Sequence, residues 1–454
     1  MTIKNEEVAR AAGLSKEEGQ LAINGGSPVR TQPLPLEFPG IHYMDEEEIE
    51  AATRVLRDRS PFRYYGVKLR DEVDQFEKAF AAHVGLPYAV AVSSGTGALH
   101  TALSALGVGP GQEIIVPAYM WVAVVAAVVN LGAIPILADI DDTFGIDPED
   151  LLRRVTPRTR GIIAVHMSGA PINVTPIAKI ARERGLFLLE DCAQANGANI
   201  GGQKVGTFGD MAVFSFQMNK NMTSGEGGCV VTRDLQLYRR AVAGHDLGYA
   251  RDEQGRLMFD DPDLCVWGRG YRLDELRGAV LRVQLRKLPT IIERMRNSKY
   301  RIRQALETLS GVKLRRIVDP AGDTGAFLIT IYEDPAIAKD VNHALRAEGI
   351  TTHPQGVSNV RMTEWGLHLY YNVVSLVMRR SVDKLGFPWS LLENAGSEMR
   401  YEKGTCPVAD GLFERSIIMS IPSCLTSEDE ADIIQAFKKV LTQYCGKVSL
   451  TRAV

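Results

Sequence analysis

The chain has 454 residues, of which 45% are hydrophobic and 24% charged, and its formal net charge is −3. These values are ordinary for a soluble globular protein and exclude disordered and fibrous classes, while the length favours two domains. The balance of charge offers no basic surface for nucleic acid or an anionic membrane.

The sequence also gives expectations about location and metals. The N-terminus lacks the apolar segment of a secretory signal, and the longest apolar run, 122–129, is too short to span a bilayer. Six cysteines are scattered without Cys-x-x-Cys spacing, which argues against a zinc site or a disulfide framework. We therefore expect a cytoplasmic protein that acts on small molecules and contains no metal.

Residues 1–40 read as a polar lead-in and an extended arm interrupted by Gly and Pro, on the surface of the protein. Asp45 is expected to cap the first helix, with Glu48 completing a capping box. The expected buried stripe of this helix is Ile49, Ala52, Val55 and Leu56. The next helix is expected to bury Val73, Phe76, Phe80 and Val84.

From residue 88 onward, short apolar runs alternate with helical patterns. Strands are expected at 89–92, 114–117, 134–138, 161–166, 186–189, 211–216 and 229–232. Helices are expected at 98–106, 122–129, 148–155 and 176–184. This alternation predicts an α/β fold with a mostly parallel sheet covered by helices on both faces. Ligands of such sheets bind beyond the carboxyl ends of the strands.

Two candidate binding features follow strands of this predicted sheet. Gly95 and Thr96 lie at a strand-to-helix turn, where small residues let backbone amides approach a phosphate at a helix N-terminus. Many α/β folds have such a turn without a ligand. Trp121 follows the next strand and has a flat face suited to an aromatic cofactor, although a tryptophan packed in the core is an equal alternative.

An acid and an amine follow two further strands, at Asp191 and Lys220. Taken singly, an Asp after a strand is usually a turn or cap residue, and a Lys in a loop is usually solvated. Together they suit pyridoxal phosphate, whose aldehyde condenses with a lysine and whose ring nitrogen needs a carboxylate to stay protonated. Such a lysine has to be desolvated or placed near a cation, because its ordinary pKa is about 10.4.

The rest of the chain predicts a second domain. A polar stretch, 245–269, precedes a long helix at 276–295 that Pro289 is expected to interrupt. We place the boundaries so that 1–40 forms the arm, 41–290 the large domain and 291–454 a smaller C-terminal α+β domain. Within the last, we expect a strand at 327–332, a helix at 336–348, a loop at 353–355, an aromatic segment at 365–371 and a closing helix at 427–441.

Several ordered motifs then resemble the DegT/DnrJ/EryC1/StrS aminotransferases. The motifs are Ser93-Ser94-Gly95-Thr96-Gly97-Ala98-Leu99, Pro117-Ala118-Tyr119-Met120-Trp121, Glu190-Asp191-Cys192-Ala193-Gln194, Ser215-Phe216 to Lys220, Gly225-Glu226-Gly227-Gly228 and Tyr271-Arg272-Leu273-Asp274-Glu275. The resemblance extends from about residue 21 to about residue 441. It implies a pyridoxal 5′-phosphate enzyme of fold type I.

The resemblance also implies roles for individual residues. Lys220 matches the lysine that forms an imine with the cofactor, Asp191 the partner of the pyridine nitrogen, and Gln194 the residue that reaches the ring face or its phenolic oxygen. The phosphate cradle corresponds to Gly95, Thr96 and Ser215. Trp121 corresponds to the aromatic residue that stacks on the pyridine ring.

The chain departs from the family pattern at three places. Asn196 stands where members commonly have His, and Gly270 stands where many have an Asn that reaches the phosphate of a neighbouring subunit. Arg269 is our candidate to replace that contact, since a guanidinium suits phosphate, with a solvated loop arginine as the alternative. The polar segment 248–266 is longer than usual and is expected to cover the site or extend a dimer contact.

The function that this resemblance implies is transamination of a keto-sugar or keto-cyclitol, with glutamate or glutamine as amino donor, in a homodimer with shared sites. The N-terminal pattern 21–30 and Trp121 lean toward the cyclitol branch. The alternatives are a sugar dehydratase, whose members lack the lysine that this chain has at Lys220, and a regulatory member that binds without turnover.

Overall fold

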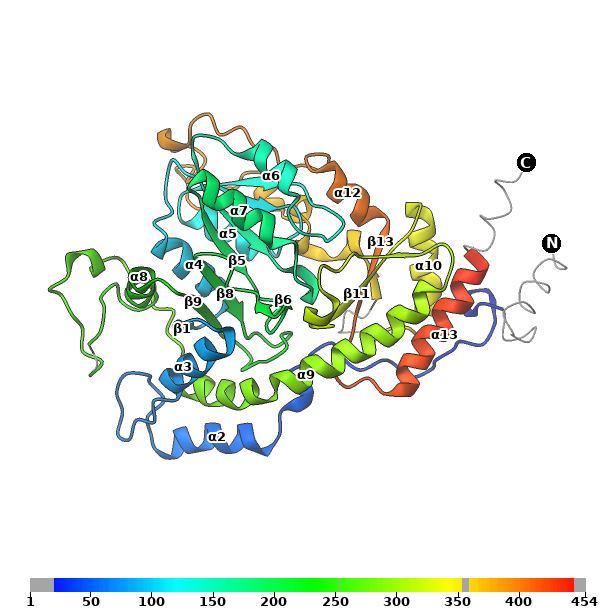
Figure 1. Ribbon diagram of the computed structural model, residues 1–454, viewed down its shortest axis with the longest axis horizontal. Helices are drawn as coiled ribbons and strands as arrows, with labels where there is room; N and C mark the ends of the chain where they lie inside the picture. The colour runs from blue at the N-terminus through cyan, green and yellow to red at the C-terminus, as the bar shows by residue number, and fades with distance from the viewer. Residues whose placement is uncertain (1–19, 253, 353–358, 445–454) are drawn as a thin grey trace.

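The computed structural model describes residues 20–252, 254–352 and 359–444. Its large domain is built around a seven-stranded sheet in the order β1-β9-β8-β5-β4-β2-β3 (Figure 1). The strands are β1 (Tyr88–Val92), β2 (Glu113–Pro117), β3 (Ile134–Ala138), β4 (Thr159–Val165), β5 (Phe187–Asp191), β8 (Met211–Ser215) and β9 (Gly228–Thr232). Only β9 runs against the others, since it pairs antiparallel with β1 and β8. The expected mostly parallel sheet is confirmed.

Helices cover both faces of this sheet, as its continuous apolar strands require. They are α3 (Glu72–Val84), α4 (Gly95–Ala105), α5 (Ala123–Asn130), α6 (Pro148–Arg154), α7 (Val174–Arg184) and α8 (Leu235–His245). Successive strand residues enter different cores, because side chains alternate across a sheet. Ala212 and Phe214 of β8 pack with α3, whereas Met211 and Val213 join the larger core on the other face.

The smaller domain has an antiparallel sheet in the order β10-β11-β13-β12. Its strands are β10 (Lys313–Leu314), β11 (Phe327–Ile331), β12 (Asn359–Arg361) and β13 (Ser416–Ser420). Two helices, α10 (Pro335–Ala347) and α13 (Ser427–Tyr444), share its core. The arm does not lie free on the surface, since Leu21 and Leu34 are buried in that core.

Shorter elements complete the described chain. A two-stranded ribbon joins β6 (Asn199–Ile200) to β7 (Gln203–Lys204), and α11 (Val374–Val377) and α12 (Pro407–Glu414) lie between β12 and β13. The expected loop at 353–355 lies outside the described residues. Within the residues that are described, no helix combines the length and the hydropathy needed to cross a membrane.

One helix, α9 (Glu275–Glu307), runs along both domains (Figure 1). Leu281 and Leu288 pack in the core between α3 and the large sheet, whereas Ile291 and Met295 pack in the core of the small domain. The expected interruption at Pro289 is wrong, because the helix continues through it. The expected boundary near residue 290 therefore falls inside a continuous helix.

The first long helix, α2 (Glu46–Arg57), has the predicted Asp45 cap and capping box, but of the predicted buried stripe only Val55 is buried. Ile49 and Leu56 are each 59% exposed, and the buried positions are Glu48, Ala51 and Val55. Helix α2 packs on α9, where Gln284 Nε2 donates to Glu48 Oε1 at 2.7 Å and Lys287 Nζ donates to Glu48 Oε2 at 2.8 Å. These hydrogen bonds allow the Glu48 carboxylate to be buried, so the helix turns its Glu48 side rather than its Ile49 side toward α9.

Candidate active site

The predicted site residues gather at one edge of the large sheet. Strands β1, β8 and β5 run in the same direction, since β1 and β8 are both antiparallel to β9 and β8 is parallel to β5. Their carboxyl ends therefore share one edge. Gly95 follows β1, Asp191 ends β5 and Ser215 ends β8.

The phosphate-cradle candidates are in direct proximity. A Cβ added to Gly95 would lie 2.8 Å from Cβ of Ser215, so the backbone of α4 comes against the end of β8 only because residue 95 has no side chain. The Ser94 hydroxyl accepts the Gly97 amide at 3.0 Å. Among the described residues no acceptor takes the amides of Gly95 and Thr96. The first turn of α4 thus keeps donors for an anion.

Asp191 is a buried carboxylate at the end of β5. In the described part of the chain, its side chain accepts one hydrogen bond, from the Ala193 amide at 2.9 Å. Burial raises the pKa of Asp191, and the Ala193 amide, the positive charge of Lys220 and His166 partly oppose that rise. A buried carboxylate with one amide partner can still accept a strong hydrogen bond from a cationic N–H group.

The strand beneath Asp191 is fixed through its neighbour Glu190. The carboxylate of Glu190 accepts the amides of Gly206, Phe208 and Gly209 at 2.7 to 2.8 Å and lies 3.1 Å from Nε2 of His166. All of these contacts are made by a side chain that is fully buried. Glu190 therefore holds the turn before β8 and the end of β4, and Asp191 sits on a rigid support.

Lys220 lies in the turn after β8, and its backbone carbonyl accepts the Gly40 amide at 3.2 Å. Burial lowers the pKa of its amine, while the charges of Asp191 and Glu226 oppose that shift. Lys220 follows β8 and Asp191 ends the neighbouring parallel strand β5, so both residues lie at the same edge of the sheet. A desolvated amine that loses its proton more easily is the form that attacks a carbonyl carbon.

Trp121 lies after β2 with 43% of its side chain exposed, so it is not a core residue. Its ring centroid is 4.7 Å from that of His368, which in turn stacks on Trp365 at 4.7 Å with an interplanar angle of 21°. His368 comes from the segment after β12, and its carbonyl accepts the Met120 amide at 3.0 Å. The three rings form an aromatic wall at the sheet edge.

Gln194 is held at both ends of its side-chain amide. Its Oε1 accepts the Ser168 amide at 2.9 Å, and its Nε2 lies 3.4 Å from Nε2 of His368. Burial lowers the pKa of His368 to about 4, and the positive charge of Lys220 adds a smaller effect in the same direction. Gln194 and Trp121 therefore meet through His368, which contacts both side chains.

Arg269 is the one predicted site residue that stands apart. Its side chain is exposed, and among the described residues no ion pair includes it. Its charge lowers the pKa of His100 in α4, although burial is the larger cause.

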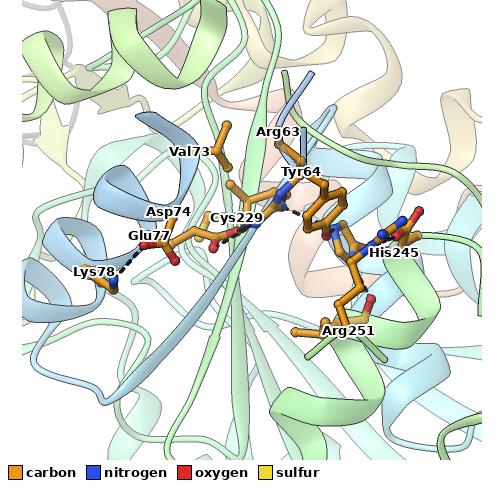
Figure 2. Close-up of polar contacts among 12 residues, drawn as sticks. Arg63, Tyr64, Val73, Asp74, Glu77, Lys78, Cys229, His245 and Arg251 are labelled. Atoms are coloured by element: carbon orange, nitrogen blue, oxygen red, sulfur yellow. Dashed lines mark hydrogen bonds and ion pairs between the residues drawn. The ribbon is translucent and has the colours of Figure 1, made fainter. Parts of the chain in front are cut away.

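A buried polar network holds the backbone that carries Arg269. Figure 2 shows Arg63 between Glu77 and His245, with Arg63 Nη2 at 3.0 Å from both oxygens of Glu77 and Nη1 at 3.2 Å from His245 Nε2. The Arg251 guanidinium lies 3.9 Å from the ring centroid of Tyr64.

Asp246 joins this network to the Tyr-Arg motif. It accepts from Arg251 Nε at 2.7 Å and from Arg272 Nη1. The amides of Arg269 and Gly270 donate to the carbonyls of Gly244 and Asp246, and Gly270 has a φ of +69°. These contacts fix the backbone of the segment after α8 near residues 244–246 and 269–270. Trp267, two residues before Arg269, is 95% exposed.

Asn196, where the family commonly has His, is buried with only 2% exposed. Neither atom of its side-chain amide has a hydrogen-bond partner among the described residues. Its carbonyl accepts Asn221 Nδ2 at 3.2 Å, next to Lys220 in the chain.

Two residues of the site were not predicted, Ser168 and His368. Both act on Gln194, and His368 also stacks on Trp121. His368 lies in the aromatic segment 365–371 that the sequence singled out without a role. Aromatic clustering around a lone His was the available signal.

The residues fit pyridoxal 5′-phosphate on structural grounds. The α4 turn and Ser215 offer donors for the phosphate, Trp121 offers an exposed ring face, and Asp191 offers a buried carboxylate with free accepting capacity. Lys220 offers a desolvated amine. This set matches what that cofactor needs at its phosphate, ring, nitrogen and aldehyde.

Known proteins agree with this assignment. A model of the DegT/DnrJ/EryC1/StrS aminotransferase family matches residues 42–362. The 3-amino-5-hydroxybenzoate synthase of Amycolatopsis mediterranei (strain S699) is 37% identical over 313 residues, covering 68% of this chain and 78% of that protein. An L-glutamine:2-deoxy-scyllo-inosose aminotransferase of Streptomyces kanamyceticus is 40% identical over 230 residues, covering 49% of this chain and 52% of that protein.

Solved structures extend the likeness to the fold. The crystal structure of 3-amino-5-hydroxybenzoic acid synthase matches with a TM-score of 0.73 and 28% identity, and the match covers 92% of this chain and 99% of that one. An aminotransferase from Streptoalloteichus hindustanus has a TM-score of 0.71 with 25% identity, covering 88% of this chain and 97% of that one. The large domain therefore has the fold type I architecture of pyridoxal phosphate enzymes, and the chain belongs to the DegT/DnrJ/EryC1/StrS aminotransferase family.

Proposed function

We propose that this aminotransferase moves an amino group from L-glutamine to the ketone of a cyclitol or sugar, with Lys220 as the catalytic residue. The proposal is supported by the positions of Asp191, a buried carboxylate at the end of β5, and Lys220, in the turn after the neighbouring parallel strand β8, where burial also lowers the pKa of the lysine amine. The bound cofactor supplies an aldehyde for the amine and a ring that accepts electrons.

The residues of the chain divide the remaining work. With the cofactor bound, Lys220 Nζ would take the proton from the α-carbon of the donor and deliver it to the cofactor carbon that carried the aldehyde, which requires the lowered pKa that burial gives the amine. Asp191 keeps a proton on the ring nitrogen. The α4 turn with Gly95, Thr96 and Ser215 holds the phosphate, and Trp121 orients the ring.

The presence of Lys220 disfavours the dehydratase alternative, and the full set of Asp191, Gln194 and Lys220 disfavours a member that only binds. The names of the relatives guide the choice of substrates. Relatives from Streptomyces kanamyceticus and Streptoalloteichus tenebrarius are L-glutamine:2-deoxy-scyllo-inosose aminotransferases. A GDP-perosamine synthase of Escherichia coli O157:H7 is 40% identical over 225 residues, so a nucleotide-linked keto-sugar is the second acceptor class.

We further propose that the active form is a homodimer in which Arg269 reaches the phosphate of the partner subunit. Its support is an exposed guanidinium without an ion pair among the described residues, carried on a backbone that the Asp246 network holds in place. Gly270 supplies no side chain for that contact. Five cysteines of the described chain are unpaired, which supports a cytoplasmic location.

The test combines a spectrum with a substrate screen. The cofactor-loaded protein is mixed with glutamine or glutamate, and loss of visible absorption reports the first half of the reaction. Keto-cyclitols and nucleotide-linked keto-sugars are then compared by the amine formed. Lys220→Ala is expected to abolish both signals, and turnover that survives this substitution refutes the assignment.

Amine formation from a keto-cyclitol with glutamine supports the proposal. Amine formation only from a nucleotide-linked keto-sugar replaces the acceptor while keeping the chemistry. If no amino acid donor bleaches the cofactor-loaded protein, transamination by this chain is refuted.

A further inference from the structure

A short hydrogen-bonded series crosses the site from the end of β4 to the segment after β12. The Ser168 amide donates to Gln194 Oε1 at 2.9 Å, and Gln194 Nε2 lies 3.4 Å from His368 Nε2. An amide oxygen only accepts and an amide nitrogen only donates. The series therefore works in one orientation of the Gln194 side chain and not in the flipped one.

The tautomer of His368 is set by the other side of its ring. Nδ1 lies 2.7 Å from the Trp365 carbonyl oxygen, which only accepts, so Nδ1 carries the proton. Nε2 of the neutral ring is then an acceptor for Gln194. Burial lowers the pKa of His368 to about 4, with Lys220 adding to the effect, so the ring stays neutral near pH 7.

The backbone at Ser168, the first residue of the series, is held in an unusual conformation. Ser168 is a non-glycine residue with a φ of +59°, a conformation that L residues adopt rarely. Its hydroxyl lies 2.7 Å from Tyr119 Oη, and the carbonyl of the next residue, Gly169, accepts the amide and the hydroxyl of Thr324. These contacts hold the turn that aims the Ser168 amide at Gln194.

The last link is equally constrained. The His368 ring is stacked on Trp365 and contacts Trp121, with centroids 4.7 Å away in both cases. Its backbone is joined to the large domain, since the His368 carbonyl accepts the Met120 amide and the Ala118 carbonyl accepts the Tyr370 amide. The ring thus has little freedom to turn its Nε2 away from Gln194.

We infer that His368 is a positioning residue, which through Gln194 fixes the amide that meets the cofactor ring. The inference rests on the proposed function of Gln194. One N–H of the Gln194 Nε2 atom is directed at His368. The second N–H of that atom then keeps a fixed direction and is free to donate to the phenolic oxygen of the cofactor ring. Loss of that donation leaves more negative charge on this oxygen, which holds the proton of the adjacent lysine-linked nitrogen more tightly.

The experiment measures the visible absorption of the cofactor-loaded protein as a function of pH. His368→Leu is expected to raise the midpoint of the spectral change by about one pH unit, the size that one hydrogen bond of ordinary strength allows. His368→Gln places an amide oxygen near the position of Nε2 and is expected to restore at least half of the shift. Gln194→Leu is expected to shift the midpoint by at least as much as His368→Leu.

The double variant decides whether His368 acts through Gln194. If it does, adding His368→Leu to Gln194→Leu changes the midpoint no further. An unchanged midpoint in His368→Leu, or shifts that add in the double variant, overturns the inference. Lys220→Ala separates the two proposals. If the Lys220→Ala protein keeps the pH-dependent absorption band, the site assignment fails. If that protein loses the band, but His368→Leu leaves the midpoint of the band unchanged, only the role of His368 fails.

Discussion

Gly95 packs so closely against Ser215 that a Cβ on residue 95 would lie 2.8 Å from Cβ of Ser215. Real Cβ atoms do not approach so closely, and both partners lie at the ends of fixed elements. The absence of a side chain at residue 95 therefore lets the α4 turn pack against the end of β8, which the proposed phosphate cradle requires.

Gly95→Ala is expected to weaken cofactor binding by about tenfold or more, because the α4 turn has to move away from Ser215 by a distance that hydrogen bonds to phosphate do not tolerate. Titration of the apoprotein with pyridoxal phosphate measures the change. Gly411→Ala is the matched control, since a Cβ there meets no atom within 4 Å. Equal affinities in the two variants would contradict the role of the cradle.

Arg269 offers a test in mixed dimers. Arg269→Ala is expected to reduce cofactor affinity, and Lys220→Ala to abolish activity, when either is present in both subunits. In a mixed dimer of the two variants, the subunit that keeps Lys220 receives Arg269 from its partner, so about half of the wild-type activity per dimer should return. If Arg269 acts within its own subunit, the mixed dimer stays as weak as Arg269→Ala.

The buried pair of Arg63 and Glu77 predicts a large effect on stability. Glu77→Gln leaves the Arg63 guanidinium buried without its counter-charge, which typically costs about 3 to 5 kcal/mol. Lys78→Ala removes the exposed pair with Asp74 on the same helix and is expected to cost far less than Glu77→Gln, because water already screens that pair. Urea unfolding measures both, and similar losses would show that the buried network contributes little.

His245 predicts a dependence of stability on pH. Burial and the charge of Arg63 lower its pKa to about 3 in the folded chain, against about 6.5 when unfolded. Between these values the unfolded chain binds the extra proton, so stability falls as pH is lowered, by about 2 kcal/mol between pH 7 and pH 5 for one such group.

His245→Asn isolates this contribution from that of other titrating groups. The variant is expected to be less stable at pH 7, but to lose about 2 kcal/mol less than the wild type between pH 7 and pH 5. Urea unfolding at the two pH values measures the difference. Parallel losses in the two proteins would show that His245 does not stay neutral in the folded chain.

The sheet and most residues of the candidate site were predictable, because both follow from local patterns. Apolar runs mark the strands, and the ends of parallel strands share an edge, so Gly95, Asp191 and Ser215 meet without further information. Ser168 was not predictable, since its role depends on a left-handed backbone conformation. His368 was not predictable either, because it reaches the site through long-range pairing with Met120.

The buried stripe of α2 was wrong for a related reason. A pattern of apolar residues ranks Ile49 and Leu56 above Glu48, whereas the structure buries Glu48 because Gln284 and Lys287 meet it there. Those partners are more than 230 residues away in the chain, and no local window contains them. The continuity of α9 through Pro289 likewise depends on two cores that hold the helix from both sides.

That continuity has a practical consequence for dissecting the protein. Helix α9 supplies Leu281 and Leu288 to one core and Ile291 and Met295 to the other. Cutting the chain at Pro289 would therefore break the helix that packs against both cores. Separately expressed halves should aggregate, and a protease should find no cleavable joint there. The molecule is best engineered as one piece, with insertions directed elsewhere.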